Sequence, residues 1–102
     1  MAQLIVLYKH PADTAAFDAY YESTHIPVAK KIPGLRRYEV SRGPVQKAGG
    51  DSPYRLIAVL SFDSLAAVQA GLASPEGQAA AADLGHFAQA GVELLMSETQ
   101  VV

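Results

Sequence analysis

Two segments of this 102-residue chain have the residue pattern of strands that are apolar on both faces. Gln3–Tyr8 reads QLIVLY and Tyr54–Phe62 reads YRLIAVLSF, so aliphatic residues occupy successive positions rather than alternate ones. A strand of this kind is expected to be buried on both sides of its sheet. At about 25 cal/mol per Å2 of apolar surface, an uncovered second face would forgo several kcal/mol of burial. The fold is therefore expected to provide a cover for each face of the sheet.

Turn and capping residues divide the rest of the chain into further strands and helices. The expected strands cover residues 3–8, 35–42, 54–62 and 92–101. The expected helices are one from Asp13 or Thr14 to residues 25–27, a helical turn over 28–31, one over 65–70 that is capped by Asp63 or Ser64, and one from its cap Ser74 to residues 83–85. The polar segment 43–53 is expected to be a loop. The order β-α-β-β-α-β over residues 1–102 predicts one α+β domain of the ferredoxin-like kind, with a four-stranded antiparallel sheet and helices on one face.

The helices of such a domain can cover only one face of the sheet. The second apolar face then needs another subunit, because an exposed patch of this size is uncommon on a monomer. We therefore expect a homodimer in which the two sheets pack face to face.

The composition excludes several classes of partner. Lys and Arg number 8 against 10 Asp and Glu, and the basic residues are scattered apart from the pairs Lys30-Lys31 and Arg36-Arg37. No apolar run is long enough to span a membrane, and the first residues lack the features of a signal peptide. The absence of cysteine excludes disulfides and thiolate catalysis. We expect a cytoplasmic protein that binds neither nucleic acid nor membrane.

The segment around His25 is the best candidate for a chemical site. Pro27 cannot donate a backbone hydrogen bond and disfavours helical dihedrals at Ile26, so the helix is expected to stop or kink beside His25. A helix C-terminus favours the imidazolium, whereas burial against Tyr20 and Tyr21 favours the neutral ring. The sequence leaves both protonation states open, and either suits proton transfer.

Four short motifs follow one another along the chain. They are Phe17-Asp18-x-Tyr20-Tyr21-x-x-Thr24-His25-x-Pro27, Pro33-Gly34-Leu35, Phe62-Asp63-Ser64-Leu65 and Val92-x-Leu94. Together they resemble the EthD-like family of dimeric α+β barrel proteins, with the first motif the most specific. The resemblance implies a ferredoxin-like subunit, a dimer, and a small-molecule pocket between sheet and helices. Family members are often labelled reductases or oxidoreductases and are associated with ether degradation, but related barrels catalyse several unrelated reactions.

One segment departs from the family pattern. Residues 83–87 read DLGHF, so Gly85 and His86 stand where proline and asparagine are expected. His86 is therefore a candidate second titratable group that meets His25 across the top of the sheet. Its alternative role is that of a surface loop residue.

The resemblance also suggests roles for the residues around His25. It directs the His25 ring into the pocket as a general acid, a general base or a ligand-binding group, whereas a purely structural histidine would only hold the helix end by a hydrogen bond. Tyr8, at the end of the first strand, is either a phenol donor to the same cavity or interior packing.

Four further residues are candidates for contact with a substrate. Tyr20 and Tyr21 are expected in the core and in the pocket wall. Tyr38 and Arg42 would either bind an anionic substrate or line the dimer surface. The expected ligand is a small apolar or aromatic molecule.

No motif for a cofactor is present. The histidines lack a spacing such as His-x-x-x-His, so no catalytic metal is expected. The segments Gly43-Pro44 and Gly49-Gly50 join two strands and do not lead into a helix, which argues against a bound nicotinamide. We expect no cofactor.

Three functions are compatible with these observations. The first is a cofactor-independent catabolic enzyme, oxidoreductase-like or isomerase-like, in which His25 moves a proton. The second is a non-catalytic module that binds or carries a hydrophobic metabolite. The third is a haem-binding barrel, for which a histidine beside an apolar pocket would suffice.

Overall fold

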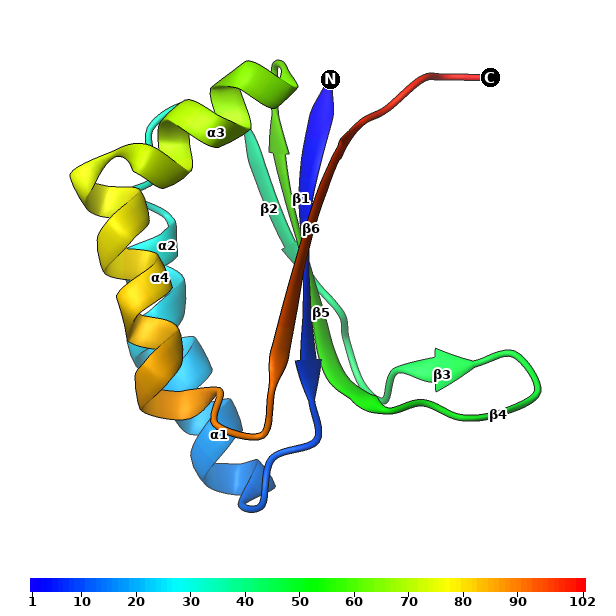
Figure 1. Ribbon diagram of the computed structural model, residues 1–102. Helices are drawn as coiled ribbons and strands as arrows, with labels where there is room; N and C mark the ends of the chain where they lie inside the picture. Colours follow the sequence, from blue (N-terminus) through cyan, green and yellow to red (C-terminus); the bar gives the residue numbers. More distant parts are fainter.

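The computed structural model describes all residues 1–102 and has two layers, helices on one side and a sheet on the other (Figure 1). The elements are β1 (Ala2–Lys9), α1 (Thr14–Tyr20), the π-helical turn η1 (Tyr21–His25), α2 (Ile26–Ala29), β2 (Arg37–Val40), β3 (Gln46–Lys47), β4 (Gly50–Asp51), β5 (Tyr54–Phe62), α3 (Leu65–Ala73), α4 (Pro75–Phe87) and β6 (Val92–Glu98). No helix is long and apolar enough to cross a membrane.

The main sheet has the strand order β2-β5-β1-β6, and every neighbouring pair is antiparallel. The two strands that are apolar on both faces, β1 and β5, therefore form its centre. This is the predicted ferredoxin-like α+β fold with its four-stranded antiparallel sheet. The expected loop between β2 and β5 also contains a short two-stranded ladder, β3–β4, which projects to the side of the sheet away from the helices (Figure 1).

The two faces of the sheet differ in burial. On β1, residues alternate between buried side chains that face the helices and half-buried ones that face away. On the helix side, Leu4 pairs with Leu60 of β5 and Met96 of β6; on the other side, Ile5 pairs with Val59 and Leu95. The chain's own helices thus cover one face only, and the outer face keeps its apolar side chains partly exposed.

The helix starts follow the predicted capping chemistry. The Asp13 side chain accepts from the backbone N–H of Ala16 at 3.0 Å, and the Ser64 hydroxyl accepts from that of Ala67 at 3.0 Å. Ser74 caps α4 by accepting from the Gly77 N–H, again at 3.0 Å. These bonds satisfy N–H groups that lack partners within the helix. Both later helices extend a few residues beyond their expected ends.

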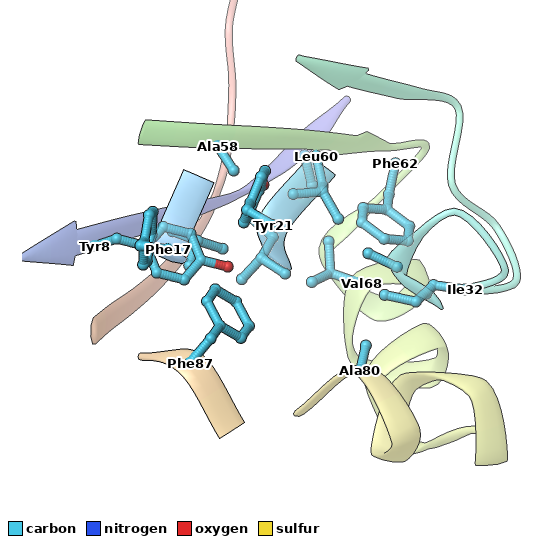
Figure 2. Close-up of a cluster of buried hydrophobic side chains, with 14 residues drawn as sticks. Tyr8, Phe17, Tyr21, Ile32, Ala58, Leu60, Phe62, Val68, Ala80 and Phe87 are labelled. Carbon is cyan, nitrogen blue, oxygen red and sulfur yellow. The ribbon is translucent and has the colours of Figure 1, made fainter. Parts of the chain in front are cut away.

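The core lies between the helices and the inner face of the sheet. Figure 2 shows aromatic rings gathered at one end, where Tyr8, Phe17 and Phe87 meet, and Phe62, Val68 and Ile32 at the other. The Tyr8 ring centroid is 5.6 Å from both Phe17 and Phe87. Burial of such rings contributes much of the stability of a small domain. The aromatic end is also where His25 lies.

The helix does not end at residues 25–27, so a stop there was a wrong prediction, but the regular α-helical hydrogen-bond ladder is interrupted beside His25 as expected. His25 and Ile26 both have right-handed helical dihedrals, and the N–H of Ile26 donates to the carbonyl of Tyr21, five residues earlier. A proline in an α-helix clashes with the carbonyl four residues before it. The wide π turn η1 comes directly before α2, and the helix continues through Pro27 in the first turn of α2. Turns of this kind are frequent at functional sites.

The α3–α4 corner depends on Gly77. A Cβ at this position would lie 2.0 Å from the carbonyl oxygen of Gly71 and 2.7 Å from the Leu72 backbone. We expect Gly77→Ala to lower the free energy of unfolding by about 3 kcal/mol, because backbone atoms cannot yield as a flexible side chain can. Gly85→Ala, also on α4 but with nothing within 4 Å of the added Cβ, should raise it by about 0.5–1 kcal/mol. Urea denaturation of both variants measures the two values, and equal stability would contradict the packing argument.

Candidate active site

His25 is a buried imidazole in the aromatic end of the core, with 5% of its surface exposed. It is the last residue of η1, and its ring packs against Tyr21 and Phe87 at centroid distances of 5.4 and 4.8 Å. The helix continues beyond it, so His25 does not lie at a helix C-terminus. The expected interaction with a helix dipole is therefore replaced by contacts with individual side chains.

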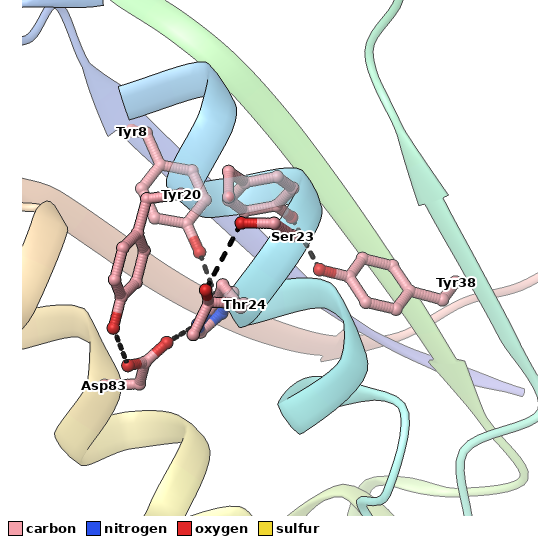
Figure 3. Close-up of polar contacts among 8 residues, drawn as sticks. Tyr8, Tyr20, Ser23, Thr24, Tyr38 and Asp83 are labelled. Carbon is pink, nitrogen blue, oxygen red and sulfur yellow. Dashed lines mark hydrogen bonds and ion pairs between the residues drawn. The ribbon is translucent and has the colours of Figure 1, made fainter. Parts of the chain in front are cut away.

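Asp83 of α4 is the main polar partner of His25. Its Oδ2 lies 2.8 Å from Nδ1 of His25, and its Oδ1 accepts a hydrogen bond of 2.6 Å from the Tyr20 hydroxyl. Figure 3 shows Asp83 reaching from α4 toward Tyr20 and the turn that carries Thr24. The Asp83 carboxylate therefore links α4 to Tyr20 and His25 on the opposite helical segment.

The protonation pattern of the pair follows from these contacts. Partial burial acts to raise the pKa of Asp83, but the hydrogen bonds from Tyr20 and His25 and the nearby histidine charges hold it below its ordinary value. An ionised carboxylate only accepts, so Nδ1 of His25 carries a proton and donates it to Asp83. In the neutral ring, the lone pair of Nε2 then points away from Asp83. It faces the hydroxyl of Tyr8, which lies 3.4 Å away.

The lowered pKa of Asp83 makes a prediction about stability. The ionised carboxylate stabilises the fold above its ordinary pKa of about 3.9, and this contribution is lost as the pH falls through the lower folded-state value. Asp83→Asn should therefore cost about 1–3 kcal/mol of unfolding free energy at pH 7, with the difference from wild type shrinking below about pH 4. Urea titrations at several pH values test this against Asp51→Asn, an exposed carboxylate without an ion pair. A difference that persisted at low pH would assign the effect to packing.

Tyrosine hydroxyls surround the imidazole. Burial raises the pKa of Tyr8, so its phenol stays protonated and can donate to Nε2. Burial likewise raises the pKa of Tyr21 and of Tyr38 on the edge strand β2, and their hydroxyls lie 2.6 Å apart. The Tyr21–Tyr38 bond ties the edge of the sheet to the helix (Figure 3).

A small cavity, here called the inner cavity, adjoins His25 between the sheet and α4. Its volume is about 40 Å3, and its lining is apolar except for Tyr8, His25 and Tyr38. This space suits a water molecule, whereas sites for small organic ligands usually occupy about 300–1,000 Å3. A substrate could therefore reach Nε2 only after side chains around the inner cavity move.

Known proteins are similar to this chain in sequence and in fold. Residues 9–91 match the EthD domain. The chain belongs to the EthD family. An uncharacterized 11.0 kDa protein in the thcB-thcC intergenic region of Rhodococcus erythropolis is 40% identical over 102 residues, which are 100% of this chain and 98% of that protein. The resemblance seen in the sequence motifs is thus confirmed.

Solved structures extend the comparison to the fold. An EthD family protein from Bacillus halodurans is 36% identical, with a TM-score of 0.89 over 98% of this chain and 99% of that one. A dimeric ferredoxin-like protein from Thermobifida fusca is 17% identical and has a TM-score of 0.70, with 96% of this chain and 90% of that one covered. At 17% identity the second comparison concerns the fold alone.

The structure of this EthD-family chain brings some of the predicted site residues together. Tyr8 and His25 share the inner cavity, as expected, and Tyr38 also lines it. Tyr21 packs against His25 and bonds to Tyr38. Tyr20 has a different position from the one expected: its ring stacks on Phe87 outside the inner cavity, and its hydroxyl fixes Asp83.

Two predicted residues lie away from His25. His86 is exposed in the last turn of α4, and no hydrogen bond joins it to His25, so of its two candidate roles the structure favours that of a surface residue. The α4 helix runs longer than expected and directs Asp83 inward instead. Arg42 is exposed after β2 and lines a separate groove. No three metal-ligating side chains come close enough to hold a metal ion.

Sequence reasoning missed Asp83, which is 58 residues from His25. A signal was present, because Ala80, Leu84 and Phe87 form an apolar stripe at helical spacing on α4 and Asp83 interrupts it. A carboxylate among core-facing positions needs a buried partner. The helix pattern alone did not say that this partner is His25.

Proposed function

We propose that this EthD-family protein is a cofactor-independent catabolic enzyme in which His25 transfers a proton on a small, partly apolar molecule. The observation that carries the proposal is the His25–Asp83 pair, 2.8 Å apart and almost fully buried. A carboxylate that holds one imidazole nitrogen orients the ring and stabilises the imidazolium that forms when the other nitrogen takes a proton. A histidine with only a structural role needs no such arrangement at the wall of a cavity.

The proposed step uses Nε2 as the base. A substrate in an enlarged inner cavity would replace the Tyr8 hydroxyl at Nε2, lose a proton to it, and leave a negative charge on a neighbouring oxygen. The Tyr8 phenol, kept protonated by burial, could donate a hydrogen bond to that oxygen. Return of the proton to a different carbon completes an isomerisation without any change in oxidation state. An oxidoreductase reaction would require an oxidant in addition to these residues.

The apolar lining of the inner cavity favours one alternative, a non-catalytic module that binds or carries a hydrophobic metabolite. The geometry opposes the haem-binding alternative. Nδ1 of His25 is engaged by Asp83, Nε2 faces Tyr8, and the inner cavity of about 40 Å3 is far too small for a porphyrin.

A deuterium-exchange assay distinguishes the proposed enzyme from a non-catalytic carrier protein. The protein is incubated in D2O with a panel of small lactones and enolisable ketones, and NMR follows loss of the C–H signal next to the carbonyl. An enzyme of the proposed kind accelerates exchange of at least one compound class above the rate in buffer. Binding without exchange across the panel would instead favour the carrier alternative.

We further propose that the protein acts as a homodimer through the outer face of the sheet. Ile5, Leu7, Ile57, Val59 and Leu95 are adjacent on this face across three strands, and 54% of Leu95 is exposed. A second copy is the natural cover, because the same apolar patch on each subunit forms a self-complementary twofold contact. The Thermobifida fusca protein of the same fold is described as dimeric, which supports the proposal.

A further inference from the structure

A groove of about 410 Å3 lies between the helical segment 18–26 and the end of the edge strand β2, beside the start of β5; we call it the β2-edge groove. Its apolar wall includes Tyr21, Ile26, Val40 and Leu56, and 41% of Val40 is exposed. This volume falls within the range for small-molecule sites, in contrast to the inner cavity. Because it lies on the helix side, the proposed dimer contact would not cover it.

Four charged groups line the β2-edge groove, and only two of them pair with each other. The Arg55 guanidinium donates to both carboxylate oxygens of Asp18, and this bond raises the pKa of Arg55. Arg42 and Glu22 are exposed, and neither forms an ion pair. The Arg42 guanidinium therefore keeps all its donors available for a ligand.

We propose that the β2-edge groove binds a small amphipathic carboxylate. The carboxylate of the ligand pairs with Arg42, whose planar guanidinium suits two-point contact. The apolar part of the ligand covers Val40 and Ile26 and removes their exposed surface from water. Glu22 opposes the binding of an anion, so its charge limits the affinity.

Tyr21 connects the groove to His25. One side of its ring lines the groove, the ring also packs against His25, and its hydroxyl bonds to Tyr38 of the inner cavity. A ligand bound in the groove is therefore separated from the imidazole by the Tyr21–Tyr38 pair. His25 does not line the groove, so the proposed binding site does not depend on the proposed function.

A matched pair of probes tests the site. Phenylacetate and phenylacetamide have nearly the same shape, but only the first is charged. Titration of the 15N-labelled protein with phenylacetate should shift the amide signals of Val40, Arg42 and Ile26. Phenylacetamide should bind at least about fivefold more weakly, which is the effect of a solvent-exposed ion pair of about 1 kcal/mol.

Variants assign the charge effect to individual residues. Arg42→Gln should weaken phenylacetate binding about fivefold and remove its preference over the amide, while Glu22→Gln should strengthen it. Both positions are exposed, so both variants should keep the fold. Equal affinity in wild type and Arg42→Gln, or shifts confined to residues outside the groove, would overturn the proposal. His25→Gln should leave phenylacetate affinity unchanged, which separates this outcome from a failure of the proposed proton transfer.

Discussion

His25→Gln is expected to reduce the proposed deuterium exchange by about 10²–10⁴-fold, the usual contribution of a general base. Glutamine preserves much of the volume of the side chain and can still donate to Asp83, but it has no nitrogen that takes up a proton near neutral pH. The circular dichroism spectrum should therefore match wild type while the NMR exchange rate falls to that of buffer.

Two other variants sharpen this result. His10→Gln is the matched control, because it removes a histidine that is exposed after β1 and whose ring bonds to the Ser52 carbonyl instead of to Asp83. It should exchange at the wild-type rate. Asp83→Asn should give a large decrease as well, since the amide no longer stabilises the imidazolium and can favour the other tautomer. Full exchange activity in His25→Gln would refute the proton-transfer role of this residue.

Val59→Asp is expected to convert the proposed homodimer into a monomer. Val59 lies near the centre of the outer face, where it pairs with Ile5 of β1 and Glu39 of β2. Burial of an unpaired carboxylate in an apolar contact costs several kcal/mol, and the twofold contact would bring in one carboxylate from each subunit. Light scattering at micromolar concentration should give twice the monomer mass for wild type and the monomer mass for the variant.

The control variant introduces the same negative charge in the helix layer, away from the outer face of the sheet. Ala66→Asp lies in the exposed first turn of α3, where an aspartate is favourable to the helix. It should remain dimeric. If the wild-type protein is monomeric under these conditions, the proposal that a second copy covers the outer face of the sheet is refuted. The partial exposure of Ile57 and Leu95 would then need an explanation other than contact with a second copy.

Local sequence patterns were sufficient for the fold. The aliphatic runs marked β1 and β5 as strands with apolar side chains on both faces, and both lie at the centre of the sheet. Asp13, Ser64 and Ser74 marked the starts of the helices, since their side chains satisfy N–H groups within three residues. The motif around His25 identified the family, and the position of Tyr8 at the end of the first strand placed it beside that histidine.

The path of the helix around His25 required the structure. Pro27 predicted an interruption, but the π turn η1 absorbs the proline and keeps His25 within a continuous helix. A sequence pattern shows where an α-helix is strained, but it does not show whether the strain is relieved by a break or by a wider turn. The outcome depends on how the surrounding aromatic rings pack, and that packing is a property of the whole core.

The sequence by itself determined the α+β fold, the family and the candidate imidazole, because each of these depends on neighbouring residues or on short motifs. Only the tertiary structure decided that Asp83, and not His86, is the partner of His25. The apolar stripe on α4 places Asp83 among the core-facing positions but does not show which residue it meets there. That partner depends on how α4 packs against the helical segment that carries His25, through contacts between segments far apart in the chain that no local pattern contains.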